Sequence, residues 1–503
     1  MGLAPSRTVV QASIPGAHEA HRRPGAVFPA HRYFVILGMF GLVAAFVLPI
    51  TYAAGAIEIG LLLVGLPVAG LILWRPEFGL YALVLYVPFE YFGIIGGSVA
   101  TLSKVVGLFT ALVLLMHLVA TGRWEVRSVG LWLALAFAAW STLSLIGARN
   151  PEHAWRELLT RIQMVGLVFV VLNACWTREQ TRALLLALFL AAVLGAVGAI
   201  VLPQPIEETA GIRRTLGTQG INAHAKDLLP GLLLLPWALS TTTRRWLKVL
   251  AVVGALVLVV DLVWTGSRSV YIAAFSGVIV GTLAYRRISM SRRVGLLLTV
   301  VLVLGVVIGL FALTGIWEAG LWRRVTDLWE RGLNLGRRLE IWGHAVSIGF
   351  EHPVMGAGVG SGKLEMLYRI GGPANVAHND VLTHFSETGI PGLLLFLGFL
   401  GAVAATVWRT ADLKLRSCML ALVAAAFAAG LANPSYGVKS WWLAMGVGLL
   451  VGKRLGAAPT PDEEQHDLLS ARGARVGEPL GGRTTPPPLD SRNRGLLPDG
   501  PFR

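Results

Sequence analysis

The sequence is poor in charge and in cysteine. Charged residues make up 14% of its 503 residues and hydrophobic residues 55%, with a mean hydropathy of +0.66. A soluble protein carries about 25% charged residues to wet its surface, so these values exclude a soluble enzyme and a disordered regulator. The two cysteines, Cys175 and Cys418, lie at the ends of different apolar runs. We therefore expect free thiols rather than a disulfide-stapled secreted domain.

Long apolar runs occupy most of the chain. A helix needs roughly 20 mainly apolar residues to cross the hydrocarbon core, and about fourteen such runs occur. They are centred near residues 42, 64, 87, 111, 138, 168, 192, 234, 256, 277, 304, 400, 424 and 445. The sequence therefore predicts an all-α polytopic membrane protein with about 12–14 transmembrane helices. No small-residue cleavage site follows the first run, which we expect to be an uncleaved span.

The two ends and one late connection differ from this pattern. Residues 1–32 and 455–503 are polar, and we expect both to be disordered cytoplasmic tails. Residues 33–314 and 390–454 contain the predicted spans. Between them, residues 315–389 form one large loop whose first part has helical spacing of apolar residues, such as Leu339 and Trp342. Long loops with internal structure are usually functional.

The distribution of Lys and Arg predicts the orientation. Basic residues are concentrated in loops on the side of the N-terminus, for example at Arg244-Arg245, Arg286-Arg287 and Arg292-Arg293. By the positive-inside rule both termini are cytoplasmic and the large loop is periplasmic, which fits a bacterial inner membrane protein. The formal net charge of +15 is then an orientation signal, and we expect no nucleic-acid partner. The basic residues that remain outside need a role of their own.

The predicted outer side carries a series of polar motifs. The large loop contains Arg338-Leu-Glu-Ile-Trp342, His352-Pro-Val-Met-Gly356-Ala-Gly358, His378-Asn379 and Glu387-Thr-Gly389. Two earlier outer loops contain Arg213-Arg214-Thr-Leu-Gly217 and Ser267-Arg268-Ser269. In this order the motifs resemble the bacterial O-antigen ligase and O-antigen polymerase family of polytopic membrane glycosyltransferases, over roughly residues 200–410. The sequence departs from the family at Gly220-Ile221-Asn222, where Asn-Pro-Asn is common.

The resemblance implies an activity and a set of site residues. Such a protein transfers a glycan from undecaprenyl pyrophosphate to an acceptor sugar hydroxyl at the periplasmic face, without a cofactor or a metal. The acceptor would be a glycan or a glycolipid such as lipid A-core, and membrane lipids surround the protein. The residues that match the family as catalytic are His378, Arg214 and Arg268. Arg338, Arg213 and Asn379 are the expected substrate-binding residues. Arg213 is also the alternative to Arg214 if the match to the family motif is shifted by one residue.

These residue types suit the chemistry. Guanidinium groups bind phosphate oxygens through a permanently charged, bidentate fork, and cations placed where charge develops lower the barrier. An acceptor hydroxyl must lose its proton as the new bond forms, and an imidazole with a pKa near neutrality suits that role.

Several alternatives remain open from the sequence. Each outer arginine could contact lipid phosphates, and His378 could be a helix cap or a packing residue. The chain could polymerise glycan repeats, act as a protein-directed O-linked oligosaccharyltransferase or, in another functional class, transport a lipid-linked glycan. Glu90, Lys104, Arg161 and Asp261 lie near outer span ends, where they could form ion pairs or line the cavity for the carrier lipid.

Three further motifs are weak. Residues 356–363 resemble a phosphate-binding loop, but Ala357 replaces the first required glycine and Leu364 the Ser/Thr. His378, Asp380 and His384 fit no strong metal-ligand spacing. Trp441 and Trp442 are expected to be interfacial anchors rather than sugar platforms.

Overall fold

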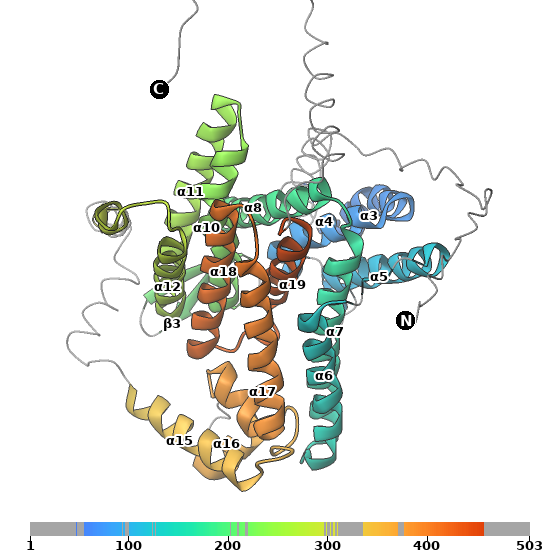
Figure 1. The fold of residues 1–503 in the computed structure, drawn as a ribbon. Helices are drawn as coiled ribbons and strands as arrows, with labels where there is room; N and C mark the ends of the chain where they lie inside the picture. Colours follow the sequence, from blue (N-terminus) through green and yellow to red (C-terminus); the bar gives the residue numbers. More distant parts are fainter. Residues whose placement is uncertain are drawn as a thin grey trace, which may run out of the picture. The chain divides into compact units, whose positions relative to one another are not determined.

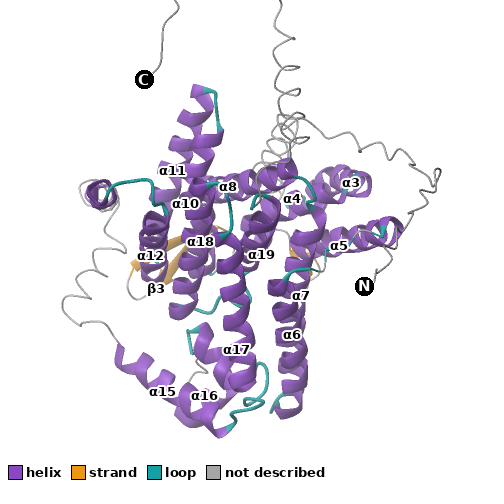
Figure 2. Ribbon diagram, in the orientation of Figure 1, coloured by secondary structure: helices purple, strands orange, loops and turns teal. Residues whose placement is uncertain are grey.

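The computed structural model describes residues 55–92, 94–95, 100–122, 124–125, 127–201, 203–208, 211–216, 220–295, 335–370 and 377–456, with a few isolated positions between 47 and 309. Figure 1 shows its helices: α3 (Ile57–Trp74), α4 (Pro76–Tyr86), η2 (Val87–Phe92), α5 (Leu102–Thr121), α6 (Val129–Leu143), η3 (Ser144–Gly147), α7 (Pro151–Ala174), α8 (Arg178–Val201), α9 (Ile221–Asp227), α10 (Leu229–Thr241), α11 (Arg245–Thr265), α12 (Arg268–Ala284), α15 (Leu335–Glu351), α16 (Gly362–Ile370), α17 (Asp380–Trp408), α18 (Leu413–Ala432) and α19 (Lys439–Arg454). Two short antiparallel hairpins, β1 (Ile94–Ile95) with β2 (Ala100–Thr101) and β3 (Pro203–Glu208) with β4 (Gly211–Leu216), complete the described elements (Figure 2).

Seven helices of the described part are long and apolar enough to cross a membrane. They are α5, α6 with η3, α7, α8, α11, α17 and α18, and they match the spans predicted near residues 111, 138, 168, 192, 256, 400 and 424. Large apolar side chains on α5 and α11, such as Leu108, Val119 and Leu250, are more than half exposed. Such bands require a lipid environment. The predicted all-α polytopic membrane fold is therefore confirmed.

Other predicted spans are shorter or interrupted. The apolar run near residue 87 is divided between α4 and the 3-10 helix η2, which contains Pro88. The run near 234 is divided into α9 and α10, with Pro230 just after the break, because proline cannot donate the backbone hydrogen bond that would continue a helix. The segments around residues 42 and 304, residues 1–32 and 457–503, and residues 315–334 of the predicted loop lie outside the described residues or almost so.

The segment predicted as the large loop is partly helical, as expected. It contains α15, α16 and the first ten residues of α17, up to its predicted end at residue 389. Gly389, with φ 67° and ψ −168°, interrupts the helical geometry of α17 at that point. Both α15 and α16 contact α17 (Figure 1).

Helices α12 and α18 pack closely and bring distant residues together. A Cβ atom on Gly277 would lie 2.7 Å from the Ala421 carbonyl oxygen, so only glycine permits this approach. Gly281, one turn later, faces Ser417 and Ala421. The two helices are antiparallel, since Ser269 at the start of α12 contacts Asn433 at the end of α18. This packing sets the beginning of α12 beside the turn that follows α18.

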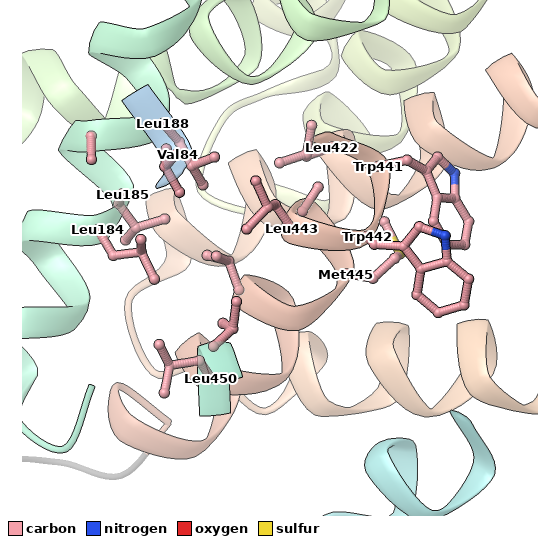
Figure 3. Packing of buried hydrophobic residues seen from close by; sticks show 14 of the residues in the cluster. Val84, Leu184, Leu185, Leu188, Leu422, Trp441, Trp442, Leu443, Met445 and Leu450 are labelled. Atoms are coloured by element: carbon pink, nitrogen blue, oxygen red, sulfur yellow. The ribbon is translucent and has the colours of Figure 1, made fainter. Parts of the chain in front are cut away.

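The main apolar core includes buried side chains of α19 together with those of α4, α8 and α18 (Figure 3). Trp441 and Trp442 are almost completely buried there, and their indole N–H groups donate to the carbonyl oxygens of Ala426 at 3.1 Å and Tyr436 at 2.8 Å. The prediction that they are interfacial anchors is therefore wrong. Their indole N–H groups donate to carbonyl groups inside the protein rather than to groups at the membrane–water interface. Cys175 and Cys418 are free, as predicted, and both are buried.

Candidate functional site

His378 lies immediately before α17 and is held on both sides. Its φ of 50° makes it the non-glycine residue with a left-handed backbone in the described part of the chain. On one side, the indole N–H of Trp342 in α15 donates to the carbonyl oxygen of Ala377 at 2.8 Å. On the other, the side chain of Asn379 caps α17 by accepting from the backbone N–H of Leu382 at 3.2 Å. A strained backbone persists only where the surroundings fix it, and such positions cluster at functional sites.

The surroundings of the imidazole disfavour its protonated form. Burial and the nearby guanidinium of Arg338 lower the pKa of His378, while a side-chain hydrogen bond with Asn433 raises it in part. The net direction is downward from the ordinary value of 6.5. Arg338 itself donates to the carbonyl oxygen of Ala432 at 3.5 Å, so α15 is joined to the end of α18. A neutral imidazole near pH 7 is able to accept a proton.

The start of α12 lies in the same polar group. The Ser267 hydroxyl donates to Oδ1 of Asn222 in α9 at 2.7 Å, and its oxygen is 3.3 Å from the Ser269 hydroxyl. The Asn433 side chain donates to the Ser269 hydroxyl at 2.9 Å. Arg268, between these two buried serines, is exposed at the first turn of α12. Hydrogen bonds thus connect the segments that carry Arg268, Arg338 and His378.

Arg213 and Arg214 lie on strand β4, opposite Ile206 and Pro205 of β3. This strand contacts α9 and α11, so the hairpin is a neighbour of the helix that carries Asn222. The structure therefore brings the backbone positions of these two arginines close to the elements of the same site.

Two groups fix α9 from opposite sides. On one side, Nε2 of His224 lies 2.8 Å from Oδ2 of Asp261 in α11, and both side chains are fully buried. Asn222 and Lys226, which are four residues apart and so share the other face of the helix, contact Ser267 and the turn after α18. The sequence analysis did not identify Lys226 or Asn433 as residues near the site, nor the pairing of Asp261 with His224. Polar residues at the start of the apolar run near 234, which include His224 and Lys226, were the signal available for α9.

A second buried polar cluster supports the loop motifs. Arg161 of α7 forms an ion pair with Glu387 of α17, and Glu387 also accepts from the backbone N–H of Gly362 at 3.3 Å. The guanidinium lies over the rings of Phe137 and Tyr436, at 5.8 and 5.5 Å from their centres. Arg161 is fully buried. This arrangement is a structural anchor between α7, α17 and the start of α16.

The Gly-rich motif fills the interruption in α17. At Gly389 the helical hydrogen bond between the Ser386 carbonyl and the Ile390 N–H is lost. The loop supplies a new partner for each group: the Ala357 N–H donates to the Ser386 carbonyl at 2.8 Å, and the Pro353 carbonyl accepts from the Ile390 N–H at 2.8 Å. The loop that resembles a phosphate-binding motif is thus a packing element for α17. No group of three metal-ligating side chains occurs among the described residues.

The imidazole of His378 lies near the guanidinium of Arg338, and hydrogen bonds join the end of α18 and the turn after it to α12, α15 and α17. Residues 253–397 match a family model described as O-antigen ligase, and this segment contains Arg268, Arg338 and His378. No curated protein matches the chain. The match within residues 253–397 of this multi-pass membrane protein is consistent with the O-antigen ligase family.

Proposed function

We propose that the protein transfers a glycan from a polyprenyl-pyrophosphate carrier to an acceptor hydroxyl at the periplasmic face of the inner membrane. The observation that carries the proposal is the set of hydrogen bonds at the end of α18 and the turn after it: Asn433 with Ser269, Ala432 with Arg338, and Ser435 with Asp380. They join the segments that carry Arg268, Arg338 and His378. The O-antigen ligase domain supports the ligase or polymerase class in general. Undecaprenyl pyrophosphate is the carrier that this class implies.

In the proposed reaction, His378 is the base. It accepts the proton of the acceptor hydroxyl as that oxygen bonds to the anomeric carbon of the donor sugar. The bond between the anomeric carbon and the pyrophosphate oxygen breaks, and polyprenyl pyrophosphate leaves with the electron pair. A pyrophosphate is a good leaving group, so no protein acid is needed to protonate it.

The arginines bind the donor and its leaving group. Arg268 is exposed at the first turn of α12, where the helix N-terminus adds a favourable partial charge for an anion. Arg214, with Arg213 beside it, is proposed to bind the same pyrophosphate from β4, and Arg338 to bind substrate next to His378. Asn379 is proposed to contact substrate while it caps α17.

The test compares two single variants in the native host. Because His378→Ala removes the base and Arg268→Ala a pyrophosphate ligand, both variants should be produced at normal levels and yield no transferred glycan on a gel of surface polysaccharide. Arg156→Ala, on the exposed part of α7, is the matched control and should keep wild-type transfer. Wild-type amounts of product in both site variants would contradict the proposal.

Two acceptors remain within the proposal, a glycolipid such as lipid A-core for a ligase and a glycan repeat for a polymerase. Incubation of the purified protein with lipid-linked glycan and each acceptor separately distinguishes them by the product that forms. If neither is used and the lipid-linked glycan crosses a vesicle membrane unchanged, the protein is a transporter instead.

A further inference from the structure

An apolar pocket lies between the neighbouring helices α8, α10 and α11 (Figure 1). Its volume is about 280 Å³, and its walls include Leu186 and Leu190 of α8, Ala238 of α10, and Leu247 and Ala251 of α11. This volume is close to the lower end of the range for small-molecule sites. The pocket is on the side of the membrane that the Lys and Arg distribution predicts to be cytoplasmic, opposite the proposed site.

Glycine residues close one end of this pocket. A Cβ atom on Gly254 of α11 would lie 3.1 Å from Val193 of α8. A Cβ atom on Gly231 of α10 would lie 2.6 Å from Leu258 of α11 and 2.7 Å from Ala192 of α8. The three helices therefore meet closely at this level. The other lining residues precede it on α8 and α11 and follow it on α10, so the pocket widens toward the α10–α11 connection.

The walls of the pocket open toward lipid. On α8, Leu186, Phe189 and Leu190 recur at three- and four-residue steps and so share one face, which is half-buried. On α11, the lining residue Leu250 is 56% exposed. Both helices are long and apolar enough to cross a membrane. An opening between two such spans faces acyl chains rather than water.

The open end of the pocket has a basic rim, which consists of Arg182, Arg244 and Lys248. Arg182 is one helical turn before Leu186 on α8, and Arg244 and Lys248 lie at the start of α11. All three side chains are exposed. Helical side chains lean toward the N-terminus of their helix, and both N-termini are at this end. Glu179 is the acidic residue in the first turn of α8, so the rim remains positively charged.

The depth of the pocket is indicated by Trp246. This residue is 55% exposed in the first turn of α11, and exposed tryptophan side chains on membrane helices favour the membrane–water interface. Gly254, at the closed end, follows Trp246 by eight residues, about 12 Å along a helix. One leaflet contributes roughly 15 Å of hydrocarbon. The pocket therefore fits within a single leaflet, with the basic rim at the level of the lipid headgroups.

We propose that this pocket binds an anionic glycerophospholipid of the cytoplasmic leaflet. One acyl chain occupies the space between α8 and α11, and the phosphate group contacts the basic rim. Basic pockets between membrane helices on the cytoplasmic side recognise anionic headgroups, and guanidinium and ammonium groups bind phosphate oxygens through charge-assisted hydrogen bonds. The inference does not depend on the proposed function, because glycan transfer is assigned to the opposite face.

The first test measures lipid binding to the purified protein in detergent. Phosphatidylglycerol and phosphatidylcholine are titrated separately, and native mass spectrometry reports the bound fraction. Wild type should bind phosphatidylglycerol at least about tenfold more tightly than phosphatidylcholine. Arg182→Gln/Lys248→Gln removes one cation from each side of the pocket and should weaken phosphatidylglycerol binding at least about tenfold. Equal affinity of wild type for the two lipids would overturn the proposal.

A second pair of arginines provides the matched control for charge. Arg287 and Arg292 are exposed after α12, on the same predicted side of the membrane, and neither lines the pocket. Arg287→Gln/Arg292→Gln removes the same number of charges and should leave phosphatidylglycerol affinity within about twofold of wild type. Equal weakening in the two double variants would mean that general surface charge attracts the lipid, and would overturn the assignment to this pocket.

Filling the pocket tests the place of the acyl chain. Ala251→Phe retains every charge but occupies the space between α8 and α11, and should weaken phosphatidylglycerol binding at least about tenfold. Val252→Phe, at a 45% exposed position of the same helix outside the pocket, is the control and should bind as wild type does. Unchanged binding in Ala251→Phe would show that the lipid contacts only the basic surface and would overturn the proposal.

Thermal unfolding gives an independent measurement. A ligand that binds the folded state raises the midpoint of unfolding, so phosphatidylglycerol should raise it more than phosphatidylcholine does in wild type and in both control variants. The rim variant and Ala251→Phe should show no such difference between the lipids, while their midpoints in detergent alone report whether they are folded. Displacement of phosphatidylglycerol by undecaprenyl phosphate at equal concentration would assign the pocket to the carrier lipid and overturn the proposal.

Discussion

Replacing Arg161 by methionine should cause a large loss of stability. Arg161 is 0% and Glu387 4% exposed, and the guanidinium is the charged partner of this carboxylate. Removing one partner of a buried ion pair costs about 3–5 kcal/mol, because the other charge remains buried without compensation. Methionine fills much of the volume that the arginine stem occupies, so lost packing adds little. We therefore expect Arg161→Met to lower the free energy of unfolding by about 3–5 kcal/mol.

A double variant separates charge from packing. In Arg161→Met/Glu387→Gln the amide oxygen still accepts from the Gly362 N–H, as the carboxylate does at 3.3 Å, but no charge is buried. The double variant should recover at least about 2 kcal/mol of the loss. The measurement is equilibrium unfolding of the purified protein in detergent, followed by tryptophan fluorescence. Arg156→Met, in an exposed ion pair on the same helix, is the control and should show no measurable change.

The reasoning would be refuted if the double variant were as unstable as Arg161→Met or less stable. That result would mean that the aromatic contacts of the guanidinium, rather than the buried charge of Glu387, account for the loss.

Three further changes test the loop motifs and the imidazole. Gly389→Ala should lower the free energy of unfolding by about 1–3 kcal/mol or more in the same assay, because this backbone geometry is essentially restricted to glycine. A Cβ atom there would also lie 2.6 Å from the Pro353 carbonyl oxygen. A variant as stable as wild type would contradict the interruption of α17 at this residue. Trp342→Phe removes the indole donor to the carbonyl before His378 and should cost about 1 kcal/mol, with lower turnover at unchanged donor KM; equal turnover would show that this bond does not position the loop. Arg338→Gln removes the cation that lowers the pKa of His378, so the acidic limb of the rate profile should move to higher pH, and an unmoved or downward-shifted limb would argue against His378 as the base.

The membrane fold could be predicted from the sequence because hydrophobic length is a local property. Runs such as 178–201 and 413–432 are both apolar and long enough in themselves. The order of the loop motifs likewise led to the family that matches residues 253–397. Pro230 could have predicted the break between α9 and α10. The high average hydropathy of the run near 234 led instead to the prediction of one continuous span.

The partners within the site could not be predicted in the same way. Lys226 contacts residues 207 to 209 positions later, and Arg161 contacts Glu387 across 226 positions. Such pairs depend on how helices pack, which a single sequence does not encode as a local pattern. The tryptophans of α19 illustrate the same point, because residues that resemble interfacial anchors in sequence are enclosed by neighbouring helices.

The most direct test of the proposed site measures donor binding and turnover separately in purified variants. Binding of undecaprenyl-pyrophosphate-linked glycan and the rate of its transfer are compared for wild type, Arg268→Ala and His378→Ala. Loss of a charged hydrogen bond costs about 1.5–3 kcal/mol, so Arg268→Ala should weaken donor binding at least about tenfold. His378→Ala should bind the donor within about twofold of wild type and transfer no glycan. Retained transfer by His378→Ala, or equally weakened donor binding in both variants, would contradict the account.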